Sequence, residues 1–148
     1  TSEKDKSLEY HTQNLQNSAK KRDLKNILEM ITPIIYGNDF LDKHIEYINQ
    51  KRNSTANIPD DFFDGLINIT DAMINDIYFT DELHKIKCPT MVVCGENDYL
   101  IPLKFSRILA KNISNSEFVI LPDCGHAAII EQANTLISLL LGFIIKNS

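Results

Sequence analysis

Two short apolar runs, each followed by an ionisable residue in a turn, constrain the fold of this chain most strongly. The first run, residues 88–94, stops at Gly95 and is followed three residues later by Asp98. The second run, residues 118–121, is followed by a turn that ends in His126. Short apolar runs bounded by turn residues are typical of buried strands, and open α/β sheets build their sites beyond the carboxyl ends of strands. We therefore predict two strands that carry an acid and a base at one edge of a sheet.

The sequence from residue 87 onward alternates predicted strands with predicted helices. Residues 102–112 place apolar side chains on one helical face, and residues 129–145 form a helix that is apolar almost all round. The connection between the two apolar runs is long enough for a crossover between parallel strands. Residues 87–148 are thus predicted to fold as two parallel strand–helix units, with the last helix heavily buried.

Residues 1–86 carry helical patterns and no convincing strand. Apolar residues recur at helical spacing over residues 24–35 and 40–48. A further helix is predicted to begin near Pro59, after a loop at residues 53–57. We expect this part of the chain to be entirely helical.

Two parallel strands make a poor sheet, because parallel strands need cover on both faces and usually have several neighbours. The stretch Met91-Val92-Val93 has the composition of an interior strand, yet this chain supplies at most one neighbour for it. The other strands are therefore expected from another polypeptide segment, or copies of the chain pair with each other. Since an unpaired strand edge is a template for further pairing, we expect the isolated chain to self-associate.

The pattern around the two runs resembles the C-terminal part of the α/β-hydrolase fold family. The positions that carry the resemblance are Pro89-Thr90, Gly95-x-x-Asp98-x-x-x-Pro102, and Gly125-His126 with the helix-forming residues 127–132 behind it. One departure is Ala133, where many members of the family carry a proline. The chain order in the family is nucleophile, acid, histidine. The resemblance implies that Asp98 is the acid and His126 the histidine of a catalytic triad.

The resemblance also implies a division of the chain. Residues 87–148 correspond to the last part of the α/β-hydrolase core, and residues 1–86 to the helical lid that precedes the acid. The Gly-x-Ser-x-Gly nucleophile motif occurs at none of the five glycines. The chain is therefore interpreted as a fragment whose nucleophile and oxyanion-hole donors lie elsewhere, and we predict that it is inactive alone.

A serine is a weak nucleophile until an imidazole takes its proton, and a buried carboxylate holds that imidazole in one tautomer. By the resemblance, the parent enzyme would hydrolyse a small ester, lactone or amide with Asp98 and His126 in these roles. That mechanism requires neither a metal nor an organic cofactor. Two alternatives stay open: a binding or assembly module of the same fold, and a dehalogenase or epoxide hydrolase with an aspartate nucleophile.

Composition bounds the partners and the compartment. The 148 residues carry a net charge of −5 and no basic stripe, which argues against nucleic acid and anionic lipid as partners. No secretory signal opens the sequence, and its longest apolar run falls far short of the ~20 residues that cross a bilayer. Three cysteines without a Cys-x-x-Cys motif suit a reducing cytoplasm, although adjacent strands would bring Cys94 near Cys124 and permit a disulfide.

Other histidines and turns offer chemical alternatives that the sequence does not favour. The glycine turn before Asp98 lacks the G-x-G-x-x-G spacing that lets a backbone approach a pyrophosphate. His11, His44 and His84 have no partner at metal-ligand spacing. We predict that these three histidines are surface or helix-packing residues.

Five further residues are predicted to have structural and not catalytic roles. Phe62 and Phe63 suit core packing better than an acyl pocket. Cys124 lies two residues before the histidine, and such neighbours on one tight turn rarely place sulfur against the imidazole ring. Glu96 is interpreted as a solvated loop residue, and Glu131 as a residue in the first turn of the last helix.

Overall fold

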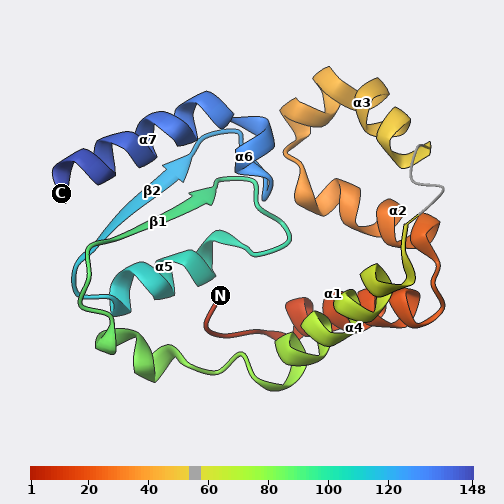
Figure 1. The fold of residues 1–148 in the computed structure, drawn as a ribbon, viewed down its shortest axis with the longest axis horizontal. Coiled ribbons are helices and arrows are strands. Elements are labelled where there is room, and N and C mark those ends of the chain that lie inside the picture. Colours follow the sequence, from red (N-terminus) through yellow and green to blue (C-terminus); the bar gives the residue numbers. More distant parts are fainter. Residues whose placement is uncertain (54–57) are drawn as a thin grey trace.

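The computed structural model describes residues 1–53 and 58–148 (Figure 1). The element bounds, in chain order, are α1 Lys6–Lys20, α2 Leu24–Ile35, α3 Asn38–Asn53, α4 Asp60–Asn75, the 3-10 helix η1 Thr80–Lys85, β1 Thr90–Gly95, α5 Leu103–Asn112, β2 Ser116–Leu121, α6 Ala128–Glu131 and α7 Ala133–Lys146. The predicted order of helices followed by two strand–helix units is confirmed. The loop predicted for residues 53–57 lies outside the described residues, apart from its first position, which ends α3.

Helices α1, α2 and α4 pack around a core of their own. Ala19 of α1, Ile27 of α2 and Phe63 of α4 are almost completely buried against one another. In Figure 1, α1 and α4 run side by side, with α2 crossing their end. The predicted core role of Phe63 is confirmed, whereas its neighbour Phe62 is exposed.

Residues 1–86 were predicted to be helical, but no apolar pattern gave the bounds of helix α1, because its buried face is largely polar. Its buried residues are Leu8, Thr12, Gln16, Ser18 and Ala19. Polar side chains can be buried at low cost only when they are hydrogen-bonded, and the helix itself provides the partners. The hydroxyl of Thr12 donates to the carbonyl of Leu8 (2.7 Å), and the hydroxyl of Ser18 donates to the carbonyl of Asn14 (3.1 Å).

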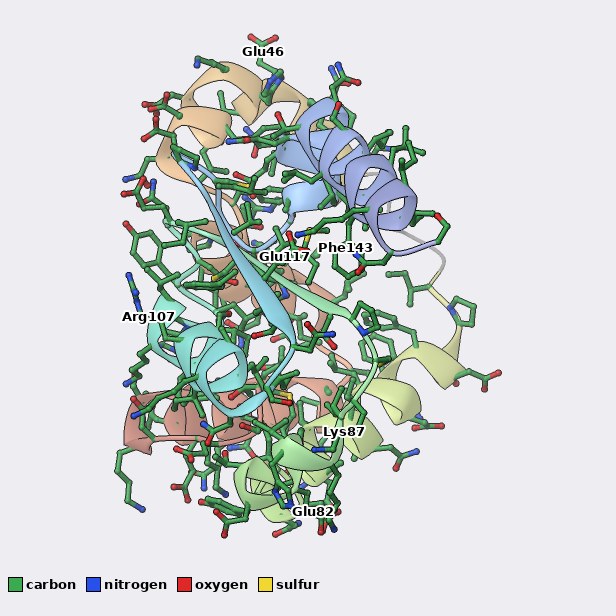
Figure 2. All side chains as sticks on the ribbon, turned by 90° about the vertical axis from the view of Figure 1, so that its left-hand side faces the viewer. Glu46, Glu82, Lys87, Arg107, Glu117 and Phe143 are labelled. Atoms are coloured by element: carbon green, nitrogen blue, oxygen red, sulfur yellow. The ribbon has the colours of Figure 1, made fainter. Side chains whose placement is uncertain are left out.

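Strands β1 and β2 form a two-stranded parallel sheet in which Gly95 lies opposite Leu121, so both strands end at the same edge. In both views the strands pass between α5 and α7 (Figures 1 and 2). An ion pair of 2.9 Å between Lys146 of α7 and Glu117 of β2 joins the last helix to the sheet. Among the described residues, the other edge of β1 has no partner strand.

The last helix differs from the prediction of one heavily buried element. Gln132 interrupts it with φ −135° and ψ 47°, which separates the single turn of α6 from α7. Large apolar side chains of α7 are between 44% and 76% exposed, namely Ile137, Leu140, Leu141, Ile144 and Ile145. Two strands offer the helix too little surface to cover it. None of the described helices combines the length and apolarity needed to cross a membrane.

Candidate active site

The acid lies in a tight turn directly after β1. The N–H of Asp98 donates to the carbonyl of Gly95 (3.3 Å), and the N–H of Ile101 donates to Oδ1 of Asp98 (2.8 Å). The side chain is buried, with 8% of the residue exposed. One carboxylate oxygen is thus held by the turn itself, and the other points toward the loop that follows β2.

The loop after β2 is joined to the acid's turn by backbone hydrogen bonds. The N–H of Glu96 donates to the carbonyl of Leu121 (2.9 Å), and the N–H of Asn97 donates to the carbonyl of Cys124 (2.8 Å). Asp123 adopts a φ of 54°, in the left-handed region that Asp tolerates better than most residues. The two chain segments therefore approach each other as one hydrogen-bonded unit.

Two glycines permit close backbone contacts around this site: Gly95 between the two strand-end turns, and Gly125 between the loop after β2 and the α2–α3 junction. A Cβ on Gly95 would lie 2.1 Å from the carbonyl oxygen of Gly125 and 2.3 Å from that of Cys124. A Cβ on Gly125 would lie 2.4 Å from the nitrogen of Gly37 and 2.6 Å from the carbonyl oxygen of Ile35. All four contacts are to backbone atoms, so a side chain at either position would force the loops apart.

Asp98 and His126, the two site residues predicted from the sequence, lie together. Oδ2 of Asp98 and Nδ1 of His126 are 2.9 Å apart. The imidazole side chain is 41% exposed, and in the described part of the chain its Nε2 has no hydrogen-bond partner. Because an ionised carboxylate only accepts hydrogen bonds, this contact fixes the proton of a neutral imidazole on Nδ1 and leaves Nε2 as the free base.

The surroundings of His126 favour its protonated form. The hydrogen bond to Asp98 raises the pKa of His126 above its ordinary value of 6.5, burial opposes this, and the negative charges of Asp98 and Glu131 add to the rise. The net effect is a stronger base than a free imidazole.

The helical part of the chain also contacts the histidine loop. The N–H groups of His126 and Ala127 donate to the carbonyl of Ile35, at 2.7 and 3.2 Å. Oε2 of Glu131 accepts from the N–H groups of Gly37 and Gly125, both at 2.9 Å. Glu131 lies in the first turn of the short helix α6, and its carboxylate also binds backbone from two other segments, which the sequence did not predict. No local pattern identifies this role, because Gly37 lies 94 residues away in the chain.

The thiol groups of the three cysteines form no hydrogen bond with Asp98 or His126 in the described part of the chain. Cys88, Cys94 and Cys124 are all free thiols, so the disulfide considered between Cys94 and Cys124 is not formed. Burial raises the pKa of Cys94, and it raises the pKa of Cys124 to about 11. A thiol with that pKa stays protonated near neutral pH, which argues against Cys124 as a nucleophile.

The remaining candidate residues lie apart from the acid–histidine pair. His11, His44 and His84 are exposed, as predicted, and His44 packs against Phe40 with 4.4 Å between ring centroids. Glu96 is exposed, and one of its carboxylate oxygens accepts the N–H of Asp123 at 3.3 Å. Within residues 1–53 and 58–148, no group of His, Cys, Asp and Glu side chains has the arrangement of a metal site.

A cavity of about 610 Å³ lies between α1, α2 and α4, beside this site. It has the size of a small-molecule pocket, for which roughly 300–1,000 Å³ is typical. Apolar residues of its wall are Leu15, Met30, Ile31, Ile34, Leu66 and Met73. Leu100, two residues beyond the acid, also lines it, and Ile34 precedes the carbonyl that binds the histidine loop. No local sequence pattern predicts this cavity, because its wall is assembled from three helices and the turn after β1.

The raised pKa of His126 predicts a pH-dependent contribution to folding. A group whose pKa is higher in the folded state stabilises the fold fully below its unfolded pKa, and the contribution is lost as pH rises through the folded pKa. We expect the difference in urea midpoint between wild type and His126→Gln to be largest near about pH 5.5 and to shrink by about pH 9. His84→Gln, at an exposed position, should show no such trend. A gap that is constant or grows with pH would contradict the Asp98–His126 pairing.

The sequence matches the family model described as alpha/beta hydrolase fold over residues 5–133. Among curated proteins, residues of this chain are 34% identical over 64 residues to "Monoacylglycerol lipase ABHD6" of Mus musculus, covering 43% of this chain and 19% of the lipase. They are 40% identical over 62 residues to "Poly(3-hydroxyalkanoate) depolymerase" of Ectopseudomonas oleovorans, covering 42% of this chain and 22% of that protein. The chain thus spans a small part of the length of these relatives.

Solved structures agree over nearly the whole chain. MGS-M2, an alpha/beta hydrolase enzyme from a Medee basin deep-sea metagenome library, superposes with a TM-score of 0.87 and 26% identity, covering 95% of this chain and 51% of that one. A thermophilic esterase from Thermogutta terrifontis superposes with a TM-score of 0.80 and 22% identity, covering 98% and 53%. The chain corresponds to about half of each of these structures. It belongs to the alpha/beta hydrolase fold family.

Proposed function

We propose that this chain supplies the acid and the histidine of an acyl-hydrolase active site. The observation that supports this most directly is the 2.9 Å contact between Oδ2 of Asp98 and Nδ1 of His126. The two residues come from the ends of adjacent parallel strands, the usual place for a site in an α/β sheet. The exposed Nε2 face of the imidazole leaves room for a nucleophile and a substrate. The substrate class that we propose is a small ester, lactone or amide.

In the proposed mechanism, Asp98 holds the proton of His126 on Nδ1, and Nε2 takes the proton of a serine hydroxyl as its oxygen attacks the acyl carbon. The imidazolium then gives that proton to the departing alcohol or amine. A water molecule repeats the sequence on the acyl-enzyme and releases the acid. Asp98 stabilises the imidazolium in both halves, in keeping with the raised pKa of His126.

The nucleophile and the oxyanion-hole donors would come from a segment that this chain does not contain. Gly-x-Ser-x-Gly is absent from the sequence, and the chain spans about half of the matched structures. The unpaired edge of β1 and the exposed apolar side chains of α7 offer surfaces on which further strands and helices would pack. We propose that residues 87–148 complete an α/β core with that segment, and that residues 1–86 act as its lid.

The cavity supports an apolar acyl group as the part of the substrate that the lid would bind. Its wall combines aliphatic and methionine side chains with polar residues of α1, and Leu100 connects it to the turn that carries the acid. Neither Asp98 nor His126 is among the lining residues, so the cavity is suited to hold a chain and not the reacting carbonyl.

The catalytic pair is tested in the assembled enzyme. His126→Ala should abolish turnover, and Asp98→Asn should lower kcat severely because the wrong imidazole tautomer is then favoured, with about 10⁴-fold as the known scale of that loss. Steady-state ester hydrolysis measures both, and His84→Gln serves as the exposed control. If Asp98→Asn leaves kcat within a few-fold of wild type, Asp98 is not the acid.

Assembly is tested by separating the two halves. The 148-residue chain alone should neither hydrolyse p-nitrophenyl esters above buffer nor react with a fluorophosphonate, and light scattering should show self-association. Adding an N-terminal half that bears Gly-x-Ser-x-Gly should restore activity that depends on His126. Hydrolysis by the chain alone would contradict the proposal, as would an assembled pair that folds but remains inactive.

The acyl cavity is tested by filling it. In the assembled enzyme, Met73→Trp should reduce kcat/KM for p-nitrophenyl octanoate relative to p-nitrophenyl acetate by about tenfold. Lost methylene contacts in an apolar pocket have effects of this order. Ala72→Trp is the matched control, because Ala72 lies next to it on α4 but is exposed and does not line the cavity. An unchanged ratio in Met73→Trp would exclude the cavity as the acyl site.

A further inference from the structure

Glu131 joins two parts of the chain that are far apart in sequence. Its Oε2 accepts the N–H of Gly37, between α2 and α3, and the N–H of Gly125, immediately before the histidine. Both distances are 2.9 Å. Hydrogen bonds to an ionised acceptor are stronger than those between neutral groups, so this one oxygen holds both segments firmly.

The same two segments are also bonded in the opposite sense. The carbonyl of Ile35 accepts from the N–H groups of His126 and Ala127. Residues 35–37 and residues 125–127 therefore form a closed set of hydrogen bonds, which we call the clasp. The clasp is packed so tightly that a Cβ on Gly37 would lie 2.9 Å from the carbonyl oxygen of Asp123.

Packing alone does not account for a carboxylate at this position. Oε1 of Glu131 is buried and has no hydrogen-bond partner among the described residues. A buried polar atom without a partner is unfavourable for folding, and a charged group is costlier than a neutral one. An apolar side chain would fill the space without that cost, but it would leave two backbone N–H groups unpaired.

We propose that Glu131 is a positioning residue: it fixes the histidine loop against the α2–α3 junction and so holds the imidazole of His126 where it meets Asp98. The helical part of the chain is then coupled to the histidine through the clasp. This inference deepens the proposed function, since the positioned histidine is the catalytic one there. The geometric claim itself is independent of turnover and is tested without it.

The test measures hydrogen exchange by mass spectrometry on the 148-residue chain. This method can be applied even if the chain self-associates. Backbone exchange reports the clasp segments, and exchange at the imidazole C2–H reports the pKa of His126. Glu131→Ala should speed backbone exchange in residues 35–38 and 124–127 by about tenfold or more. It should also lower the pKa of His126, which the charge of Glu131 and the hydrogen bond to Asp98 raise.

Two further variants separate positioning from charge and from general loss of stability. Glu131→Asp keeps the negative charge but is one methylene shorter, so it cannot reach both N–H groups; we expect faster exchange in at least one clasp segment and a lower pKa of His126. Glu96→Ala is the matched control, because the exposed Glu96 carboxylate binds the N–H of Asp123 in the same loop. It should leave both clasp segments and His126 as in wild type.

The outcomes are decisive in each case. If Glu131→Ala unfolds the chain, seen as equally fast exchange in β1 and β2, Glu131→Asp decides the question. Clasp exchange within about twofold of wild type in the folded variants would overturn the proposal. An effect of Glu96→Ala as large as that of Glu131→Ala would overturn it as well. Loss of the clasp with intact ester hydrolysis in the assembled enzyme would overturn the positioning role and leave the catalytic pair standing.

Discussion

The contact between the turn after β1 and the loop after β2 is the constraint on which the site depends. Parallel pairing brings both strand ends to one edge, and Gly95 lets its backbone approach the backbone of Cys124 and Gly125 at distances that a Cβ would not permit. The backbone bonds from Glu96 and Asn97 then lock the two turns together. Because these two turns are fixed relative to each other, the buried carboxylate of Asp98 and the partly exposed imidazole of His126 are held within hydrogen-bonding distance.

The sheet has only two strands among the described residues, and the sequence lacks a Gly-x-Ser-x-Gly nucleophile motif. β1 has one strand neighbour among the described residues, and α7 turns large apolar side chains to the outside. Apolar surface of this extent on one helix is typical of an interface. The superpositions cover about half of each of the two matched structures. Under the proposed function, a further segment would supply both the additional strands and the nucleophile.

The helical part of the chain, residues 1–86, is hydrogen-bonded directly to the loop that carries His126. The carbonyl of Ile35 and the N–H of Gly37 lie at the junction of α2 and α3, and both bond directly to residues around the histidine. The cavity between α1, α2 and α4 begins beside the same junction. Under the proposed function, a substrate group bound in the cavity would contact α2, whose C-terminal end is hydrogen-bonded to the histidine loop.

The sequence by itself determined the alternation of strand and helix after residue 87, the two strand ends, and the pairing of Asp98 with His126. These features follow from local patterns: apolar runs, glycine turns and the order of an acid and a histidine. The bounds of helix α1, the exposure of α7 and the role of Glu131 were decided by the tertiary structure alone. Each depends on what lies opposite in space: polar groups satisfied inside a helix, a sheet too narrow to cover its last helix, and two N–H groups brought to one carboxylate from 94 and 6 residues away. Periodicity along a chain carries no information about such distant partners.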